Sequence, residues 1–325
     1  MIDKLLNICF IGAGSIATSL GNILSNKKNL KITLFSIEEN IVESINYKKI
    51  NIKYFPNIIL NSALKASLDP KSLKSADIIF LAIPSSALVK YVFEIQDYIN
   101  PKAILINLAK GFGINNKIIT ECLSEELPNP VCTLKGPAFA RDIINNNSTA
   151  LTFASENKEF SEIISGVFSD TNINLDFSSD IRGVEMASIL KNIYAIIIGI
   201  VDANFDSPNL RFLILNKAFK EMKTLLVQFG GKRKTLFKYC GFGDFCLTAL
   251  NDLSRNRTLG LLIGKGFFTA DISDKVLLEG KVATIVFCEE ISKTNSLKKF
   301  PLITELYKVF TEEYDVSQFV KHILK

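Results

Sequence analysis

The second half of the sequence contains two side chains suited to proton transfer. Lys191 precedes Asn192 inside the apolar run ASILKNIYAIIIGI. Burial there disfavours the charged ammonium, and an ammonium that gives up its proton readily suits donation to a carbonyl oxygen as hydride arrives. Asp244 stands among glycines in GFGDFCLT, with Thr248 one helical turn later. The alternatives are a lysine whose head reaches the surface and an aspartate that caps a helix.

A third segment combines groups that suit a phosphate. The run Ser254-Arg255-Asn256-Arg257 joins guanidinium groups to a hydroxyl and an amide, and a guanidinium can bind two phosphate oxygens at once. The alternative is an exposed basic loop. Lys110 precedes a glycine at the end of a predicted strand, and ligands of open α/β sheets bind beyond the carboxyl ends of the strands.

The residue types available for acid–base chemistry are restricted. The only histidine is His322, close to the end of the chain, so the proton donor is expected to be a lysine, tyrosine, glutamate or aspartate. Cys240 and Cys246 flank the glycines around Asp244, which leaves a dehydrogenase with a thiol nucleophile as a rival. A metal site is not predicted, because none of the six cysteines forms a CxxC pair.

A dinucleotide-binding turn is predicted near the start of the chain. The segment Gly12-Ala13-Gly14-Ser15-Ile16-Ala17 follows an apolar strand and precedes a helix. Gly12 permits the tight turn, Gly14 lets the backbone approach a pyrophosphate, and Ala17 is an accepted substitute for the third glycine of the fingerprint. Ser15 and Ile16 begin the helix whose free N–H groups would hold the anion.

The choice between NAD and NADP stays open at this point. Ser36, which follows the second predicted strand, is neutral, and Glu38 and Glu39 can belong either to the ribose site or to the next helix. No arginine stands there to receive a 2′-phosphate. Lysines 48, 49 and 53 can approach it, or they can be solvated surface residues.

Unbroken apolar strands alternate with helical segments in the first part of the chain, a pattern typical of a parallel sheet buried on both faces. The fold class is therefore α/β: an N-terminal Rossmann-like, mostly parallel sheet domain at 1–179, followed by an all-helical domain at 180–325. The predicted strands lie at 6–11, 30–35, 77–83, 103–108, 131–134, 150–154 and 173–177. Helices are expected at 15–24, 38–45, 86–98, 180–201, 211–229 and 284–292.

Composition excludes several classes of protein. The net charge is +5 over 325 residues, without a dense basic block, so a nucleic-acid partner is not expected. The N-terminus lacks a basic region followed by a cleavable apolar stretch, and the cysteines are expected to be free thiols in the cytoplasm. The apolar stretch 184–201 contains Glu185 and Lys191, so a buried helix is favoured over a membrane span.

Nine segments in order resemble the NAD(P)-dependent glycerol-3-phosphate dehydrogenase family. They are IGAGSIATSL, AKG, GPAFA, LKNIYAI, NLRFLILNKAFKEM, GFGDFCLT, SRNRTLG, LEG and PLITELY, and they extend over nearly the whole chain. The resemblance implies reduction of dihydroxyacetone phosphate to sn-glycerol 3-phosphate by NADH or NADPH, supplying phospholipid synthesis, in a cytoplasmic homodimer. Rival interpretations are another two-domain dehydrogenase with a helical C-terminal domain, and a non-catalytic dinucleotide-binding protein.

The resemblance also implies roles for single residues. Lys191 matches the catalytic lysine and Asp244 its carboxylate partner. Residues matching the triose phosphate site are Lys110, Gly136, Ser254, Arg255 and Asn256, to which the motifs add Asn192 and Thr248. Residues matching the dinucleotide site, besides the glycine turn, are Ser15, Ile16, Lys110, Ala140, Arg255, Leu277 and Glu279.

Three positions depart from the family pattern. Ala138 replaces a common serine or threonine, and Lys217 replaces a common arginine. The segment after the second strand lacks the usual arginine or histidine, which bears on the choice of cofactor.

Overall fold

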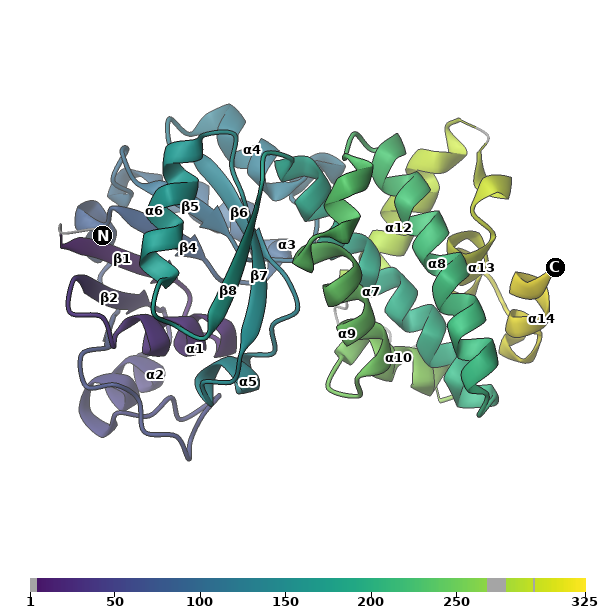
Figure 1. Ribbon diagram of the computed structural model, residues 1–325, viewed down its shortest axis with the longest axis horizontal. Coiled ribbons are helices and arrows are strands. Elements are labelled where there is room, and N and C mark those ends of the chain that lie inside the picture. Colours follow the sequence, from purple (N-terminus) through teal and green to yellow (C-terminus); the bar gives the residue numbers. More distant parts are fainter. Residues whose placement is uncertain (1–4, 268–278, 295) are drawn as a thin grey trace. The chain divides into compact units, whose positions relative to one another are not determined.

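The computed structural model describes residues 5–267, 279–294 and 296–325. Its contacts divide the chain into two compact units, Met1–Ile181 and Arg182–Lys325. Within the described residues, all named strands belong to the first unit, and the second unit is built from helices (Figure 1). The predicted boundary after residue 179 lies close to this division.

The first unit is an eight-stranded sheet with the order β3-β2-β1-β4-β5-β6-β7-β8. Neighbouring strands are parallel except for β6 and β7. The strands are β1 (Leu6–Ile11), β2 (Leu30–Phe35), β3 (Lys65–Ser67), β4 (Ile78–Leu81), β5 (Ile104–Asn107), β6 (Val131–Lys135), β7 (Thr149–Ala154) and β8 (Ile173–Ser178). The mostly parallel α/β architecture predicted from the sequence is confirmed.

Both faces of the sheet are covered, which explains why its strands are continuously apolar. Along β1, Ile8 and Phe10 join one hydrophobic cluster, whereas Cys9 and Ile11 join another. Successive side chains of a strand point to opposite faces, so a strand between two helical layers needs an apolar residue at every position. The covering helices are α1 (Ser15–Leu24), α2 (Glu39–Glu43), α3 (Ser85–Glu94), α4 (Ile119–Glu126), α5 (Ala140–Ile144) and α6 (Lys158–Phe168).

The sheet differs from the sequence prediction at three places. Strand β7 is antiparallel to β6, and the connection between them contains only the five-residue helix α5. The apolar pattern of β7 could not reveal this, since a strand buried on both faces looks the same in either direction. The short edge strand β3 was not predicted, and the helix expected at 38–45 changes to a π-helix at Ser44–Lys48.

The strand order reverses between β1 and β4, which is where open α/β sheets bind ligands. Strand β2 lies on one side of β1 and β4 on the other, and each is parallel to it. The carboxyl end of β1 therefore opens at this reversal, directly before the glycine turn at residues 12–14.

The second unit is built around the helix α7 (Ile181–Asn204), which is buried along almost its whole length. Among the described residues it is the one helix long and apolar enough to cross a membrane, and its most apolar window is entirely buried within the protein. The other helices are α8 (Pro208–Gln228), α9 (Asp244–Leu250), α10 (Arg255–Gly264), α12 (Glu279–Ser292), α13 (Pro301–Thr311) and α14 (Phe319–Leu324).

Candidate active site

The two glycines of the turn after β1 have different reasons to be glycine. Gly12 has a φ of +109°, and a Cβ there would lie 2.8 Å from the carbonyl oxygen of Ala82. Gly14 has an ordinary φ of −72°, and a Cβ there would meet no protein atom within 4 Å. Gly12 therefore serves the fold, whereas the space beside Gly14 is open for a ligand.

Helix α1 begins at Ser15 directly after this turn. In the described part of the chain no side chain caps its start, so the N–H groups of its first turn remain available for an anion. Ala17 is completely buried, which lets the helix pack closely on the sheet. The predicted dinucleotide residues Ser15 and Ile16 are partly exposed in this first turn.

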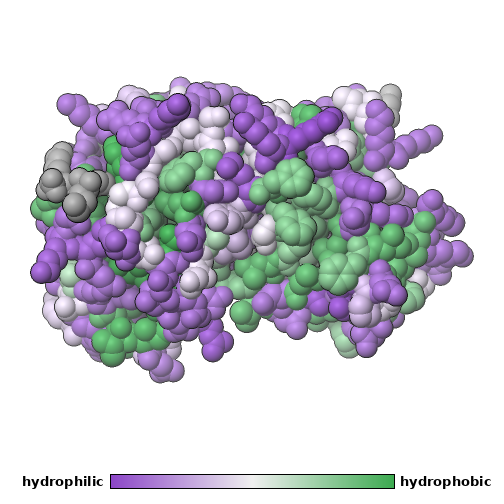
Figure 2. All heavy atoms as spheres, viewed as in Figure 1, coloured by the Kyte–Doolittle hydropathy of each residue, from purple (hydrophilic) through white to green (hydrophobic). Residues whose placement is uncertain are grey.

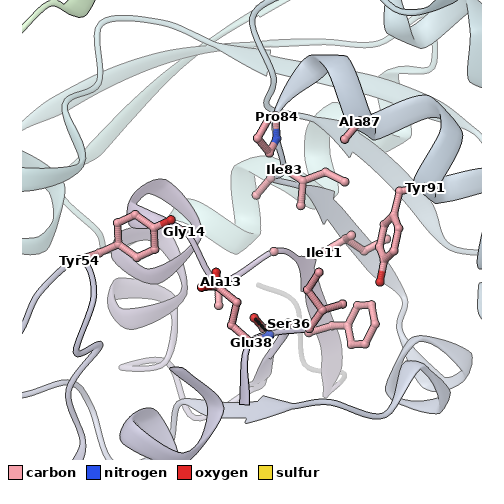
Figure 3. Close-up of a pocket in the computed structure, with 14 residues that line it drawn as sticks. Ile11, Ala13, Gly14, Ser36, Glu38, Tyr54, Ile83, Pro84, Ala87 and Tyr91 are labelled. Atoms are coloured by element: carbon pink, nitrogen blue, oxygen red, sulfur yellow. Dashed lines mark hydrogen bonds between the residues drawn. The ribbon is translucent and has the colours of Figure 1, made fainter. Parts of the chain in front are cut away.

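A cavity of about 280 Å³ opens at the glycine turn (Figure 3). It reaches from the end of β1 to the end of β2, where Ser36 and Glu38 line it, and to the end of β4, where Ala82, Ile83 and Pro84 line it. The remaining lining residues are Ile11, Gly12, Ala13, Gly14, Phe35, Ile37, Tyr54, Ala87 and Tyr91. A mostly apolar cavity beside an uncapped helix start fits a dinucleotide.

Ala140 also lies beside this helix. The hydroxyl of Ser19 in α1 is 2.8 Å from the carbonyl oxygen of Ser15 and 2.8 Å from that of Ala140, so it can donate to either. The start of α5 is thereby held against α1. Two segments predicted to contact the dinucleotide thus meet, although 121 positions separate Ser19 from Ala140.

Two lysines connect the ends of β5 and β6. Lys110 Nζ donates to the carbonyl oxygen of Gly136 at 3.3 Å. In the other direction, the buried Lys135 Nζ donates to the carbonyl oxygens of Asn107, at 3.0 Å, and of Ala109. Lys110 therefore contacts Gly136 directly, and Lys135, which sequence reasoning missed, holds the end of β6 to the segment just before Lys110.

Lys135 was missed because a lysine at the end of a strand is usually solvated. A signal was present: Lys110-Gly111 and Lys135-Gly136 repeat the same pair at the ends of two strands. Gly136 has a φ of +154°, and a Cβ there would lie 2.7 Å from the carbonyl oxygen of Ala150, so glycine is required for the backbone path.

In the second unit, Lys191 is buried and lies between two oxygen acceptors. Its Nζ is 2.8 Å from Asp244 Oδ1 and 2.7 Å from Thr248 Oγ1. Lys191 and Asp244 are only 4% and 1% exposed, so water competes little with their ion pair. The prediction that Asp244 and Thr248 share one helix face is confirmed, because both residues of α9 accept a hydrogen bond from the same ammonium.

The start of α10 is brought to α7 by close contact between backbones. A Cβ on Gly260 would lie 2.0 Å from the carbonyl oxygen of Ile196, and a Cβ on Gly199 would lie 2.3 Å from that of Arg257. No side chain can fit at this crossing. The glycines therefore allow α10 to approach the turn of α7 that follows Lys191.

The residues at the start of α10 have distinct tasks. Ser254 caps the helix, its Oγ accepting from the N–H of Arg257 at 3.3 Å. Arg255 is exposed and is the first residue of the helix. Arg257 is buried and donates to Asp202, to Asp252 at 3.0 Å and to the carbonyl oxygen of Ala249 at 3.0 Å. Arg255 can therefore reach a ligand, whereas Arg257 holds the helices together.

Asn192 and Asn256 meet around the first turn of α12. Asn192 Nδ2 is 3.4 Å from Glu279 Oε2, and a Cβ on Gly280 would lie 2.6 Å from Asn256 Oδ1. The Oδ1 atom of Asn256 is buried and has no hydrogen-bond partner among the described residues. A buried acceptor without a partner is costly, so a donor from a ligand would stabilise it. Leu277, another predicted dinucleotide residue, lies outside the described residues.

The thiol rival finds no support at the two cysteines. Cys240 is buried and its Sγ donates to the carbonyl oxygen of Thr235 at 3.9 Å. Burial raises the pKa of Cys246 above its usual value, whereas a nucleophilic cysteine needs a lowered pKa.

The structure shows what surrounds the two residues that depart from the family pattern, Lys217 and Ala138. Lys217 Nζ donates to the carbonyl oxygen of Ile323 at 3.0 Å, which ties α8 to α14. Ala138 is partly buried against the core of the sheet unit.

The fold and these groups define a class: a nicotinamide-dependent dehydrogenase with a Rossmann-type sheet and a helical C-terminal unit. The sequence model for the N-terminus of NAD-dependent glycerol-3-phosphate dehydrogenase matches residues 7–161, and the model for its C-terminus matches residues 180–321. The chain therefore belongs to the NAD-dependent glycerol-3-phosphate dehydrogenase family.

Individual relatives agree with the family match. The glycerol-3-phosphate dehydrogenase [NAD(P)+] of Clostridium acetobutylicum is 33% identical over 322 residues, covering 98% of this chain and 96% of the relative. The enzyme of the same name from Leptospira biflexa is 30% identical over 327 residues, covering 98% and 97%. The crystal structure of glycerol-3-phosphate dehydrogenase from Coxiella burnetii matches with a TM-score of 0.89 at 29% identity, covering 98% and 99%.

Proposed function

We propose that this chain interconverts dihydroxyacetone phosphate and sn-glycerol 3-phosphate, with NADH or NADPH as the reductant. The observation that carries this proposal is the buried ammonium of Lys191, bound to Asp244 and Thr248. It belongs to the same helical unit as the start of α10, where Arg255 is exposed. With the reduced nicotinamide as the hydride source, the groups that the protein must supply are a proton donor and a site that binds the phosphate.

Lys191 is the proposed proton donor. When hydride reaches C2 of the substrate, negative charge develops on the carbonyl oxygen, and Lys191 Nζ gives a proton to that oxygen. In the oxidation of the alcohol the same nitrogen accepts the hydroxyl proton. Asp244 and Thr248 hold Nζ in one direction, and the carboxylate compensates the charge of the ammonium before it donates.

The start of α10 is the proposed phosphate site. The N–H groups of its first turn carry partial positive charge, Arg255 can add two charge-assisted hydrogen bonds, and the amide of Asn256 can contact the substrate. Ser254 contributes mainly by shaping the helix start, since its Oγ already accepts from Arg257. Lys110, Gly136 and Asn192 are further substrate residues that the family resemblance proposes.

The residues at the glycine turn fit a dinucleotide. The open space at Gly14 admits a pyrophosphate, and the uncapped start of α1 at Ser15 and Ile16 offers N–H donors to it. Ala140, Lys110, Arg255, Leu277 and Glu279 are proposed as further contacts. When bound, the nicotinamide ring accepts or supplies the hydride.

The test is reduction of dihydroxyacetone phosphate by purified protein, followed by the loss of reduced-nicotinamide absorbance. Dihydroxyacetone, which carries the same carbonyl without the phosphate, is the matched control substrate. Turnover with the phosphorylated ketone and little with the control supports the proposal. Absence of turnover with either reduced cofactor contradicts it.

We also propose that the chain acts in the cytoplasm as a homodimer, supplying glycerol 3-phosphate for phospholipid synthesis.

Hydrophobic side chains gather over the helical unit (Figure 2). The ring of Phe219 packs against those of the exposed Phe237 and Phe242, and α8, which carries Phe219, also exposes Phe212 and Leu213. Such a cluster suits a self-association surface. A monomeric mass by light scattering for the wild type, or a dimer unchanged by Phe237→Ser, contradicts this use of the surface.

A further inference from the structure

The end of β2 presents one acidic side chain to the cofactor cavity. Ser36 is buried, its N–H donates to the carbonyl oxygen of Ser67 at 3.0 Å, and its Oγ accepts from the N–H of Glu38 at 3.1 Å. Glu38 lines the cavity and is the only charged residue that does so among the described residues (Figure 3). The hydroxyl oxygen of Ser36 thus accepts a hydrogen bond from the backbone, whereas the carboxylate of Glu38 faces the cavity and can contact a ligand.

Glu38 is paired with Lys53, which comes from the loop that follows the π-helix. Lys53 Nζ is 2.6 Å from Glu38 Oε2, with both side chains partly exposed. The two neighbouring lysines, Lys48 and Lys49, do not line the cavity. The pair has no net charge, so the cavity offers no excess of positive charge at this end.

The loop that carries Lys53 is fixed to the glycine turn by a buried amide. Asn51 Nδ2 donates to the carbonyl oxygen of Ala13 at 2.9 Å and to Thr18 Oγ1 at 2.8 Å. Its Oδ1 accepts from the N–H groups of Lys53 and Tyr54 at 3.3 Å. Lys53 and Glu38 therefore keep a defined position relative to the turn that faces the pyrophosphate.

NADH and NADPH differ at the adenosine ribose, where NADPH has a 2′-phosphate in place of a hydroxyl. A ribose hydroxyl can donate to the Glu38 carboxylate without disturbing Lys53. A phosphate can gain Lys53 only by breaking the ion pair, and the carboxylate then lies beside a second anion. We infer that Glu38, held by Lys53, makes this chain select NADH over NADPH. The inference rests on the proposed function for its cofactor.

The test measures equilibrium binding of NADH and NADPH by fluorescence, without substrate. Wild-type protein is expected to bind NADH at least about tenfold more tightly than NADPH, since like charges held close together are strongly unfavourable. Glu38→Gln should tighten NADPH binding and weaken NADH binding, reducing this ratio at least about fivefold. Lys53→Met should have the opposite effect, weakening NADPH further while leaving NADH nearly unchanged.

Glu39→Gln is the matched control, because Glu39 is exposed, adjacent in sequence and outside the cavity lining. It removes the same charge and should leave the ratio at its wild-type value. The inference is overturned if wild-type protein binds NADPH as tightly as NADH, if Glu38→Gln and Glu39→Gln change the ratio equally, or if neither cofactor binds. Selective NADH binding without turnover of dihydroxyacetone phosphate would overturn the proposed function alone.

Discussion

The glycine turn of the sheet unit and the lysine site of the helical unit are built in opposite ways. The turn is six consecutive residues, 12–17, and it acts mainly through backbone N–H groups and empty space. The lysine site brings together side chains that are distant in sequence, since 53 positions separate Lys191 from Asp244 and 57 separate it from Thr248. Side chains supply the two contacts of the Lys191 ammonium with Asp244 and Thr248.

Because of this difference, substitutions in the two regions should have different effects on ligand binding and on stability. A contiguous backbone turn can lose its ligand while the fold survives, because the protein itself does not fill the open space. A buried side-chain cluster holds helices together as well as carrying chemistry, so its loss affects both. The predictions below test this contrast, beginning with the largest expected effect.

Replacing Lys191 should remove the proton donor. Lys191→Met keeps the length of the side chain and removes the ammonium, so turnover should fall by about 10²–10⁴-fold, the usual contribution of a general acid. Single-turnover oxidation of NADH by dihydroxyacetone phosphate measures this step. Affinity for NADH should change little.

Because this variant leaves Asp244 buried without its cation, a second variant is needed. Lys191→Met combined with Asp244→Asn removes both charges and should recover part of the lost thermal stability without recovering turnover. Turnover within a few-fold of wild type in Lys191→Met would assign the proton to another residue.

Substitution of Gly14 should weaken cofactor binding, whereas substitution of Gly12 should lower the stability of the fold. Gly14→Val places a side chain in the space open to the pyrophosphate, so binding of NADH and NADPH should weaken by at least about tenfold, or roughly 1.4 kcal/mol. The melting temperature should change little, because a Cβ at Gly14 meets no protein atom within 4 Å.

Gly12→Ala is the matched comparison, since it combines a positive φ with a contact of 2.8 Å to the carbonyl oxygen of Ala82. It should lower the melting temperature clearly. Equal losses of stability in the two variants would abolish the distinction between a fold glycine and a ligand glycine.

We expect Arg255 to bind the substrate and the neighbouring Arg257 to hold the helices together. Arg255→Ala should lower kcat/KM for dihydroxyacetone phosphate by at least about tenfold, because a charge-assisted contact to a phosphate is worth roughly 1.5–3 kcal/mol. Dihydroxyacetone, which lacks the phosphate, should be affected little at saturating NADH. Steady-state kinetics with both substrates measure the difference.

Arg257→Ala provides the control within the same segment. It removes one of the two guanidinium groups bonded to the Asp202 carboxylate, whose side chain is 3% exposed, so it should lower the melting temperature, whereas Arg255→Ala should not. An equal loss on both substrates in Arg255→Ala would show that Arg255 does not bind the phosphate.

The smallest expected effect is a pH dependence of stability in the helical unit. Glu221 of α8 accepts hydrogen bonds from two N–H groups at the start of α13, those of Leu302 at 2.8 Å and Ile303 at 3.3 Å. It also accepts one from the hydroxyl of Tyr194, which lies one turn beyond Lys191 in α7. Burial raises the pKa of Glu221 from 4.5 to about 7. The protonated carboxyl is therefore favoured in the folded state.

This raised pKa has a defined sign for stability. Its contribution is complete below about pH 4.5 and is lost as the pH rises through 7, because the folded state must then give up a proton that it holds more tightly than the unfolded state does. Glu221→Gln cannot titrate. The melting temperature of wild type minus that of the variant should fall between pH 4.5 and 7.5, and a difference independent of pH would contradict the assignment.

The two regions also differ in how much could be predicted. The end of β1, the turn and helix α1 follow from local pattern, because a buried parallel strand is uniformly apolar and glycines mark the turn. The antiparallel direction of β7 did not follow, since burial on both faces gives the same pattern in either direction. Lys135 was not predicted either: the Lys-Gly pair repeated at 110–111 and 135–136 marks the ends of two strands, but the local sequence does not indicate that these ends meet around a buried ammonium.

The sequence alone determined the residue types: two glycines before a helix, an ammonium in an apolar helix, and a guanidinium beside a hydroxyl and an amide. These are local properties of the chain. Only the tertiary structure decided which of two neighbouring arginines is exposed, which of two glutamates lines the cavity at the glycine turn, and that Thr248 joins Asp244 at the Lys191 ammonium. Those choices depend on how close distant segments come, and that is set by packing, such as the approach of α10 to α7 at Gly199 and Gly260, where no side chain fits.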